Sequence, residues 1–275
     1  MRAAKILRQD MGYHLFILAV LALTLFPIWV MVAISFKSSG QFFSQPFTFT
    51  WPLHWENYAR SWLTVKDGIL NSVVISVGAT IGAMLAAIPA AYVLGQLRPA
   101  GTKFLWGMYL FLLMMPAVAN LIPLFTLLGQ LNLLNTLWGL IWVGTAAGQV
   151  FSVFVLKHFV EELPKDLFEA AEIDGASHFA RMVNIVIPLS LPILATIGVM
   201  RFIHEWNNFI LPLVAIRDEE KLPLVVKLFQ LDGAYVKDYG VLMAAYVLAS
   251  IPLVLLFLVA MKSFVRGLSS GAVKG

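Results

Sequence analysis

The dominant pattern in this chain is a series of long apolar stretches separated by shorter polar ones. Six stretches approach or exceed the roughly 20 residues that a helix needs to cross the hydrocarbon core of a bilayer. They are apolar on every face, which is typical of membrane spans and not of amphipathic surface helices. The pattern predicts an all-α, polytopic membrane protein with six transmembrane helices, at residues 15–36, 69–94, 104–128, 137–156, 185–209 and 241–264.

Composition agrees with this pattern. Hydrophobic residues make up 60% of the 275 residues and charged residues 12%, about half the charged share of a soluble domain. The chain contains no cysteine, which excludes disulfides and thiolate chemistry. The first apolar stretch is too long for a signal peptide, and the following "VAISFKSS" offers no small-residue cleavage site. We therefore expect a retained first helix.

The basic residues predict the orientation of the spans. Eleven Lys and Arg residues lie in the segments on the side of both termini, and seven lie on the opposite side in two longer loops. Basic residues accumulate in short cytoplasmic segments, so we expect both termini in the cytoplasm of a multi-pass protein. The predicted organisation has three parts: residues 1–67 (N-terminal segment, first helix and outer loop), 68–264 (a core of five spans) and a tail, 265–275.

The outer segment 37–67 is rich in Phe, Trp and Tyr. Two interpretations are open: an aromatic belt with packing inside the loop, since Trp and Tyr settle at headgroup depth, or a docking surface for an external partner.

A polar segment at 157–187, on the cytoplasmic side, interrupts the apolar pattern. It reads "KHFVEELPKDLFEAAEIDGASHFARMVNIVI". Pro164 suits a helix start, Asp174-Gly175 suits a helix end, and Ser177 suits the cap of a second helix. Leu167, Phe168 and Ala171 fall within one turn and predict a small apolar face. That face either contacts a partner protein or packs against the ends of the spans.

The same segment resembles the EAA loop of binding-protein-dependent ABC importer permeases. The resemblance rests on Glu169-Ala170-Ala171, Gly175 and the ending Ile185-x-Ile187-Pro188, where the family usually has Leu in place of Ile187. It implies a type I ABC importer permease fold with a coupling helix seated in a groove of a separate ATPase. The implied coupling residues are Leu167, Phe168, Glu169, Ala170, Ala171, Asp174 and Gly175.

No phosphate-binding G-x-x-x-x-G-K-[ST] loop, metal-binding histidine spacing or nucleophile motif occurs in the sequence. We therefore expect no enzyme activity and no cofactor in this chain, with ATP and magnesium bound by the partner ATPase.

Three later segments, "FIHEWNNFILPL", "LPLVVKLFQ" and "FVRGLSSGAVKG", resemble sugar-importer permeases of the maltose-transporter type, in particular the smaller six-span partner. This resemblance implies half of a sugar pathway in a prokaryotic cytoplasmic membrane. The implied partners are a second homologous permease, an ATPase dimer, an extracytoplasmic sugar-binding protein and membrane lipid, and no nucleic acid. The alternatives are a permease for a non-sugar solute such as a polyamine, and an ion-coupled secondary transporter. The second alternative is disfavoured because the acidic residues lie in loops or near span ends.

Polar residues in and near the spans are candidates for the substrate path. Arg201 and Glu205 are four residues apart and can pair on one helix face. An internal ion pair, a contact with the sister permease and a substrate path are all open interpretations. The loop 217–238 is likewise either a packed cap or a segment that approaches the sugar cleft of the binding protein. The candidate path residues are Asn71, Asn120, Gln149, Arg201, Glu205, Asn207 and Asn208.

Overall fold

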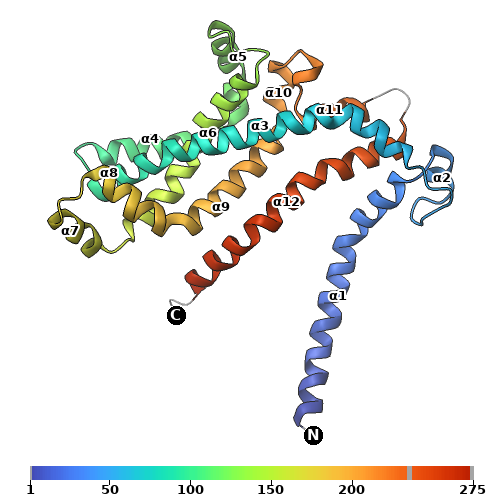
Figure 1. The fold of residues 1–275 in the computed structure, drawn as a ribbon, viewed down its shortest axis with the longest axis horizontal. Coiled ribbons are helices and arrows are strands. Elements are labelled where there is room, and N and C mark those ends of the chain that lie inside the picture. The colour runs from blue at the N-terminus through green and yellow to red at the C-terminus, as the bar shows by residue number, and fades with distance from the viewer. Residues whose placement is uncertain (1, 234–236, 273–275) are drawn as a thin grey trace. The chain divides into compact units, whose positions relative to one another are not determined.

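The computed structural model describes residues 2–233 and 237–272; within them, side chains are described except at 2–10, 117–118 and 262–272. All regular elements in these ranges are helices, which confirms the all-α prediction. In chain order they are α1 (Arg2–Ser35), α2 (Ser39–Ser44), α3 (Glu56–Tyr92), α4 (Thr102–Met114), α5 (Leu121–Gln130), α6 (Leu137–Glu161), α7 (Lys165–Ile173), α8 (His178–Arg181), α9 (Ile187–Trp206), α10 (Ile210–Ala215), α11 (Leu224–Asp232) and α12 (Tyr239–Ala272) (Figure 1).

Five helices in the described ranges are long and apolar enough to cross a membrane: Met11–Ser35, Glu56–Leu97, Leu137–Glu161, His178–Trp206 and Tyr239–Met261. They correspond to five of the six predicted spans. The second of them starts at Glu56, well before the predicted residue 69, because its first turns are polar and aromatic but still helical.

The third predicted span, 104–128, is interrupted in the structure. Two shorter apolar helices, α4 and α5, take its place, with a 3₁₀ turn at Ala117–Asn120 between them. Pro116 explains the break, because proline lacks a backbone N–H and disfavours the helical conformation of the preceding residue. Met115 accordingly is extended, with φ −73° and ψ 125°.

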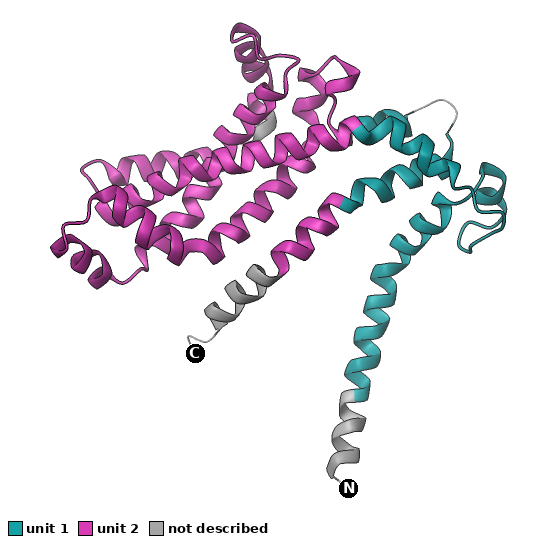
Figure 2. Ribbon diagram, viewed as in Figure 1, with its two compact units in different colours: residues 1–66, 227–251 teal, residues 67–226, 252–275 magenta. Residues whose placement is uncertain are grey.

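The chain forms two compact units (Figure 2). The first comprises residues 1–66 and 227–251, and the second residues 67–226 and 252–275. These two units are defined by contacts within the chain. The three-part organisation expected from the sequence, with boundaries at residues 67 and 264, stays a prediction.

Polar contacts to backbone join the helix ends within the first unit. The Asn57 amide donates hydrogen bonds to the carbonyls of Ser35 (3.0 Å) and Lys37 (2.9 Å), and Ser61 donates to the carbonyl of Val241 (2.6 Å). Lys37 is buried and donates to the carbonyl of Gln45. Burial lowers the pKa of Lys37. These bonds tie the end of α1 to the starts of α3 and α12.

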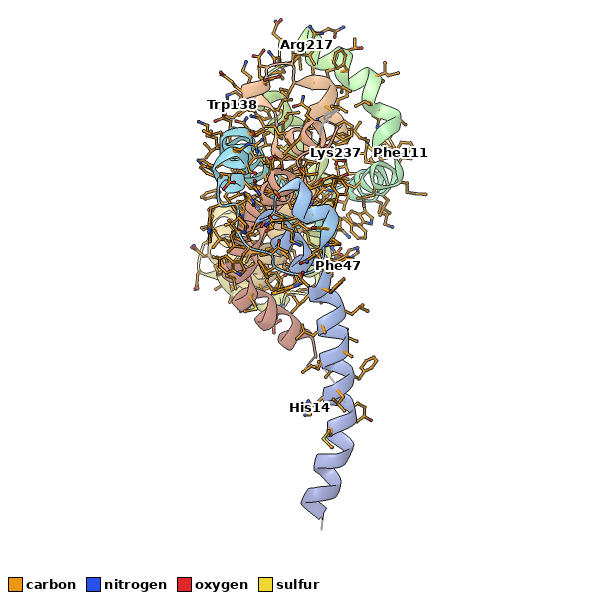
Figure 3. All side chains as sticks on the ribbon, turned by 90° about the vertical axis from the view of Figure 1, so that its right-hand side faces the viewer. His14, Phe47, Phe111, Trp138, Arg217 and Lys237 are labelled. Carbon is orange, nitrogen blue, oxygen red and sulfur yellow. The ribbon has the colours of Figure 1, made fainter. Side chains whose placement is uncertain are left out.

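The aromatic segment belongs to this unit and is only partly packed. Phe42 stacks on Tyr239 with ring centroids 4.2 Å apart, and Phe47, labelled in Figure 3, lies 6.1 Å from the Phe26 ring of α1. Trp51 and Trp55 are exposed. The structure therefore supports packing of the segment against α1 and α12, and an external partner for the exposed rings stays a hypothesis.

Among the glycines of the first unit, Gly240 has the least space for an added Cβ. A Cβ at this residue would meet the carbonyl oxygen of Lys37 and the side chain of Asn57. We expect Gly240→Ala to lower the free energy of unfolding by about 1–3 kcal/mol, because a backbone carbonyl cannot move aside as a side chain does. Thermal unfolding of the full chain in detergent measures the loss. Gly107→Ala, in α4 with nothing within 4 Å of the added Cβ, is the control and is expected to be neutral or stabilising. Equal effects of the two substitutions would contradict the close packing at Gly240.

In the second unit, α6 packs against α9 (Figure 1), and apolar clusters lie at both ends of α6. One cluster joins the first half of α6 to α10 through Leu140, Ile141 and Leu211. The other joins the last turns of α6 to α7 through Leu156, Val160 and Phe168. Helix α6 therefore connects α7 at one end of this unit with α10 at the other.

Candidate functional site

Helix α7 forms at Lys165–Ile173, and its termination follows the sequence prediction. Pro164 is the N-cap rather than a residue of the first turn, and Asp174 is the C-cap. Gly175 takes the left-handed conformation, with φ 76°. The N–H groups of Gly175 and Ala176 donate to the carbonyls of Glu172 (3.0 Å) and Ala171 (2.8 Å). This is the bond pattern of a Schellman motif, and it makes the turn after α7 compact.

The second helix of the segment also begins as predicted. The Ser177 hydroxyl caps α8 by accepting a hydrogen bond from the N–H of Ala180 (3.2 Å). A π-helical turn at Met182–Val186 follows, and α9 then continues into the membrane. Helix α7, its turn and α8 are therefore connected to a membrane span without an intervening loop.

Two buried side chains hold α7 in place. Phe168 is 7% exposed and packs in the apolar cluster at the end of α6, with its ring stacked 6.4 Å from that of Tyr92. Arg181 is buried, and its Nη1 donates to Oε2 of Glu172 in α7 (3.0 Å). The burial of Phe168 supports one of the two interpretations of the small apolar face, namely packing against the ends of the spans.

The opposite face of the segment is open. Leu167, Glu169 and Ala170 are exposed, and Ala171 is half-buried. The predicted face of Leu167, Phe168 and Ala171 is therefore divided, with Phe168 turned inward and Leu167 outward.

Two large exposed residues were missed among the coupling candidates. Ile173 is 87% exposed and Phe179 is 71% exposed. Phe179 occupies a position where the EAA pattern often carries an aromatic residue, a signal present in the sequence. Ile173 gave only a weak signal, as a large apolar residue at the end of an acidic helix.

The turn at Gly175 allows a graded test. Nothing lies within 4 Å of a Cβ added there, so Gly175→Ala meets only the backbone penalty of the left-handed conformation, about 1–2 kcal/mol. Gly175→Pro is incompatible with this positive φ and also removes the N–H that bonds to Glu172. We expect a small fall in melting temperature for the first variant and early proteolysis of the 174–177 turn for the second. Equal protease resistance of both variants would contradict the turn geometry.

A second polar cluster lies between α6 and α9. Arg201 and Glu205 are each 6% exposed and form an ion pair through Nη2 of Arg201. The same nitrogen donates to the carbonyl of Gly144 (3.3 Å). A Cβ at Gly148 would lie 2.6 Å from Nε of Arg201, and one at Gly144 would lie 3.0 Å from the Glu205 carboxylate. The two glycines of α6 thus provide the space that the ion pair occupies.

The other path candidates are distributed over the second unit. Asn208 lies 3.4 Å from Oε2 of Glu205 and extends the ion-pair cluster, whereas Asn207 donates to the carbonyl of Ile203 in its own helix. Asn71 donates to the carbonyls of Glu220 and Leu222 (2.7 and 3.2 Å), and the Tyr109 hydroxyl donates to Gln149 (3.0 Å). Asn120 is exposed at the end of the 3₁₀ turn. Only Arg201, Glu205 and Asn208 form one cluster, and a role of these residues in a substrate path stays a prediction.

The loop 217–238 begins with exposed residues, 217–220, and becomes packed from Leu222. Leu222, Leu224 and Val226 are buried, and the Ser72 hydroxyl accepts a hydrogen bond from the N–H of Leu224 (2.9 Å). Phe229 and Gln230 are exposed, and residues 234–236 lie outside the described part. Residues 222–226 are therefore packed against the rest of the unit, and the choice between a cap over the pathway and a segment that approaches a binding protein stays open.

Comparison with known protein families identifies the transport machinery to which these features belong. The family described as "binding-protein-dependent transport system inner membrane component" matches residues 83–270, which include α7, its turn and the Arg201 cluster. The chain belongs to this family. It is therefore an inner-membrane transport component, and a transport role rather than catalysis follows from this membership.

Individual relatives and a solved structure agree with this assignment. The diacetylchitobiose uptake system permease protein NgcG of Streptomyces coelicolor is 34% identical, over 90% of this chain and 83% of the relative. The melibiose/raffinose/stachyose import permease protein MelC of Bacillus subtilis is 28% identical over the full length of both chains. A chain in the crystal structure of a bacterial ABC transporter involved in alginate import superposes with a TM-score of 0.82 at 24% identity, covering 96% of this chain and 98% of that one. The likeness confirms the type I ABC importer permease fold.

Proposed function

We propose that this chain is a permease subunit of an ATP-driven carbohydrate importer, in which it forms half of the translocation pathway. The observation that carries the proposal is family membership together with a rigid, surface-exposed α7 joined directly to a membrane span. The sugar class is supported by relatives named for the uptake of diacetylchitobiose and of melibiose, raffinose and stachyose.

The proposal includes partners that lie outside this chain. A separate ATPase dimer binds ATP and magnesium and receives the exposed face of α7 and α8. An extracytoplasmic binding protein delivers the sugar, and a second, homologous permease completes the pathway. Both termini and α7 face the cytoplasm, as the distribution of basic residues favours.

The proposed mechanism follows from the contacts that hold α7 against the membrane spans. Closure of the ATPase dimer pushes α7, and the anchors Phe168 and Arg181 pass the displacement to the ends of α3, α6 and α9. A short helix held by a buried aromatic ring and an ion pair moves as a unit, whereas a loose loop would absorb the motion. The result is a change of the pathway between inward-facing and outward-facing states.

The test is uptake by a reconstituted complex of this chain with the ATPase, second permease and binding protein that the proposal requires. A panel of labelled oligosaccharides is compared with a labelled polyamine, in the presence of ATP or of a non-hydrolysable analogue. We expect ATP-dependent uptake of at least one oligosaccharide and none of the polyamine. Uptake of the polyamine alone would favour the non-sugar alternative, and uptake driven by an ion gradient without ATP would overturn the proposal.

A further inference from the structure

Three segments of the second unit meet at the end of α6 that lies near α7. They are the π-helical turn Val93–Leu97 with Arg98 after it, the first turns of α4, and the last two turns of α6. The Gln96 amide donates to the carbonyl of Val160 (2.6 Å), and a Cβ at Gly95 would lie 3.2 Å from the Val160 side chain. The backbones are therefore close, and charged side chains of different segments are brought together.

Cationic groups outnumber acidic ones at this junction. The Glu161 carboxylate lies 2.9 Å from Nζ of Lys157, 3.1 Å from Nη2 of Arg98 and 3.5 Å from Nδ1 of His158. Lys103 is exposed in the first turn of α4. Glu162, the other carboxylate of these segments, is exposed and forms no ion pair within the described residues. These segments thus carry three permanent cations and two carboxylates, and Glu161 is the carboxylate that pairs with Lys157 and Arg98.

Not all N–H groups of these cationic side chains have a hydrogen-bond acceptor in the described part of the protein. The Lys157 ammonium has three N–H groups; it contacts Glu161 and lies 4.3 Å from the centroid of the Trp106 ring. Arg98 donates through Nε to the carbonyl of Gly95 (2.8 Å) and through Nη2 to Glu161, which leaves Nη1 without a protein acceptor in the described ranges. The Arg98 side chain is 55% exposed. Arg98 therefore offers an exposed donor at the surface of the cluster, and the buried Lys157 adds positive charge beneath it.

The surface next to this cluster is apolar and exposed. Helix α4 carries Phe104, Leu105, Met108 and Leu112 as exposed side chains, and Phe111, labelled in Figure 3, is 64% exposed. Trp106 lies between this surface and α6, with its ring stacked on Phe154 at 5.6 Å. A cationic end followed by an exposed apolar helix is complementary to a phospholipid, whose phosphate is followed by acyl chains.

We propose that the junction of Arg98, Lys103, Trp106 and Lys157 binds the headgroup of an anionic phospholipid, with the acyl chains along α4. Basic sites between helices at the membrane surface recognise such headgroups, and each Lys or Arg near the surface contributes about 1 kcal/mol, which is about fivefold in affinity. The site is distinct from α7 and adds a lipid dependence to the proposed transport function.

The test uses the purified full-length chain in a neutral detergent and native mass spectrometry. It is titrated separately with phosphatidylglycerol, with phosphatidylcholine of the same acyl chains, and with glycerol phosphate. We expect phosphatidylglycerol to bind at least fivefold more tightly than phosphatidylcholine. The variant Arg98→Gln with Lys103→Gln should bind phosphatidylglycerol about tenfold or more weakly than the original chain. The swap Arg98→Lys with Lys103→Arg should keep the affinity for this lipid within twofold of the original.

The matched control is Lys165→Gln with Arg217→Gln, which removes the same charge from exposed positions elsewhere in the second unit. An equal loss in this control would show unspecific charge attraction and overturn the proposal, as would equal binding of the two lipids. Glycerol phosphate binding as tightly, with the same dependence on Arg98 and Lys103, would identify a soluble anion as the ligand and also reject the lipid.

Discussion

Arg201→Met is expected to lower the free energy of unfolding by about 3–5 kcal/mol, because it leaves the Glu205 carboxylate buried without its partner. The double variant Arg201→Met with Glu205→Leu should recover most of this loss, since replacing both members of a buried pair by apolar groups is often neutral. Thermal unfolding of the full chain in detergent measures both effects.

An exposed ion pair in the same unit provides the control for this experiment. Lys221 and Asp218 are three residues apart, with Nζ and Oδ2 2.7 Å apart, and the hydrogen bond from Lys221 lowers the pKa of Asp218. Lys221→Met should lower the melting temperature little, because exposed ion pairs contribute little to stability. A loss in Arg201→Met no larger than this would show that the buried pair does not join α6 and α9.

The double variant also separates the two interpretations of the cluster. If the pair only joins helices, the reconstituted complex with Arg201→Met and Glu205→Leu should transport at close to the original rate. A stable double variant that has lost uptake would place Arg201 and Glu205 in the substrate path.

The second large effect is expected at the exposed face of the coupling segment. Ile173→Asp with Phe179→Asp should leave the melting temperature within a few degrees of the original, because both side chains are exposed. The same variant should reduce co-purification of the ATPase by at least tenfold, because it places two carboxylates in an apolar contact. Co-purification and sugar-stimulated ATP hydrolysis are the measurements.

Phe168→Ala is the complementary substitution. It removes the buried anchor of α7 and is expected to destabilise the protein by about 3–5 kcal/mol. Lys165→Gln, exposed at the start of α7, is the neutral control. If the double Asp variant retains normal ATPase binding, the docking face lies elsewhere and the assignment of Ile173 and Phe179 is wrong.

The features that could be predicted from the sequence are those determined by local chemistry. The end of α7 at Asp174-Gly175 and the Ser177 cap depend on residues within one or two turns, and both are as predicted. The i,i+4 pair of Arg201 and Glu205 is local in the same sense. Of the six spans predicted from long apolar runs, five correspond to helices long enough to cross a membrane, because the bilayer requires that length.

Features that depend on distant residues could not be predicted in this way. Burial of Arg201 depends on Gly144 and Gly148, more than fifty residues earlier in the chain. Hydropathy alone did not show that Pro116 divides the third span, and periodicity did not show which side of α7 the end of α6 covers. The outward orientation of Ile173 and the inward orientation of Phe168 follow from that tertiary contact.

The π-helical turn at Met182–Val186 has a consequence for the helical phase of the segment. A π turn accommodates one more residue than the α-helix around it. Deleting Asn184, which is exposed, would allow 178–206 to form a regular α-helix. Because the π turn winds the extra residue into one wider turn, this deletion would change little the direction in which α8 and α7 face relative to α9, whereas the same extra residue in a regular α-helix would rotate that face by about 100°. The π turn thus keeps the coupling segment in phase with α9 although the chain carries an additional residue there.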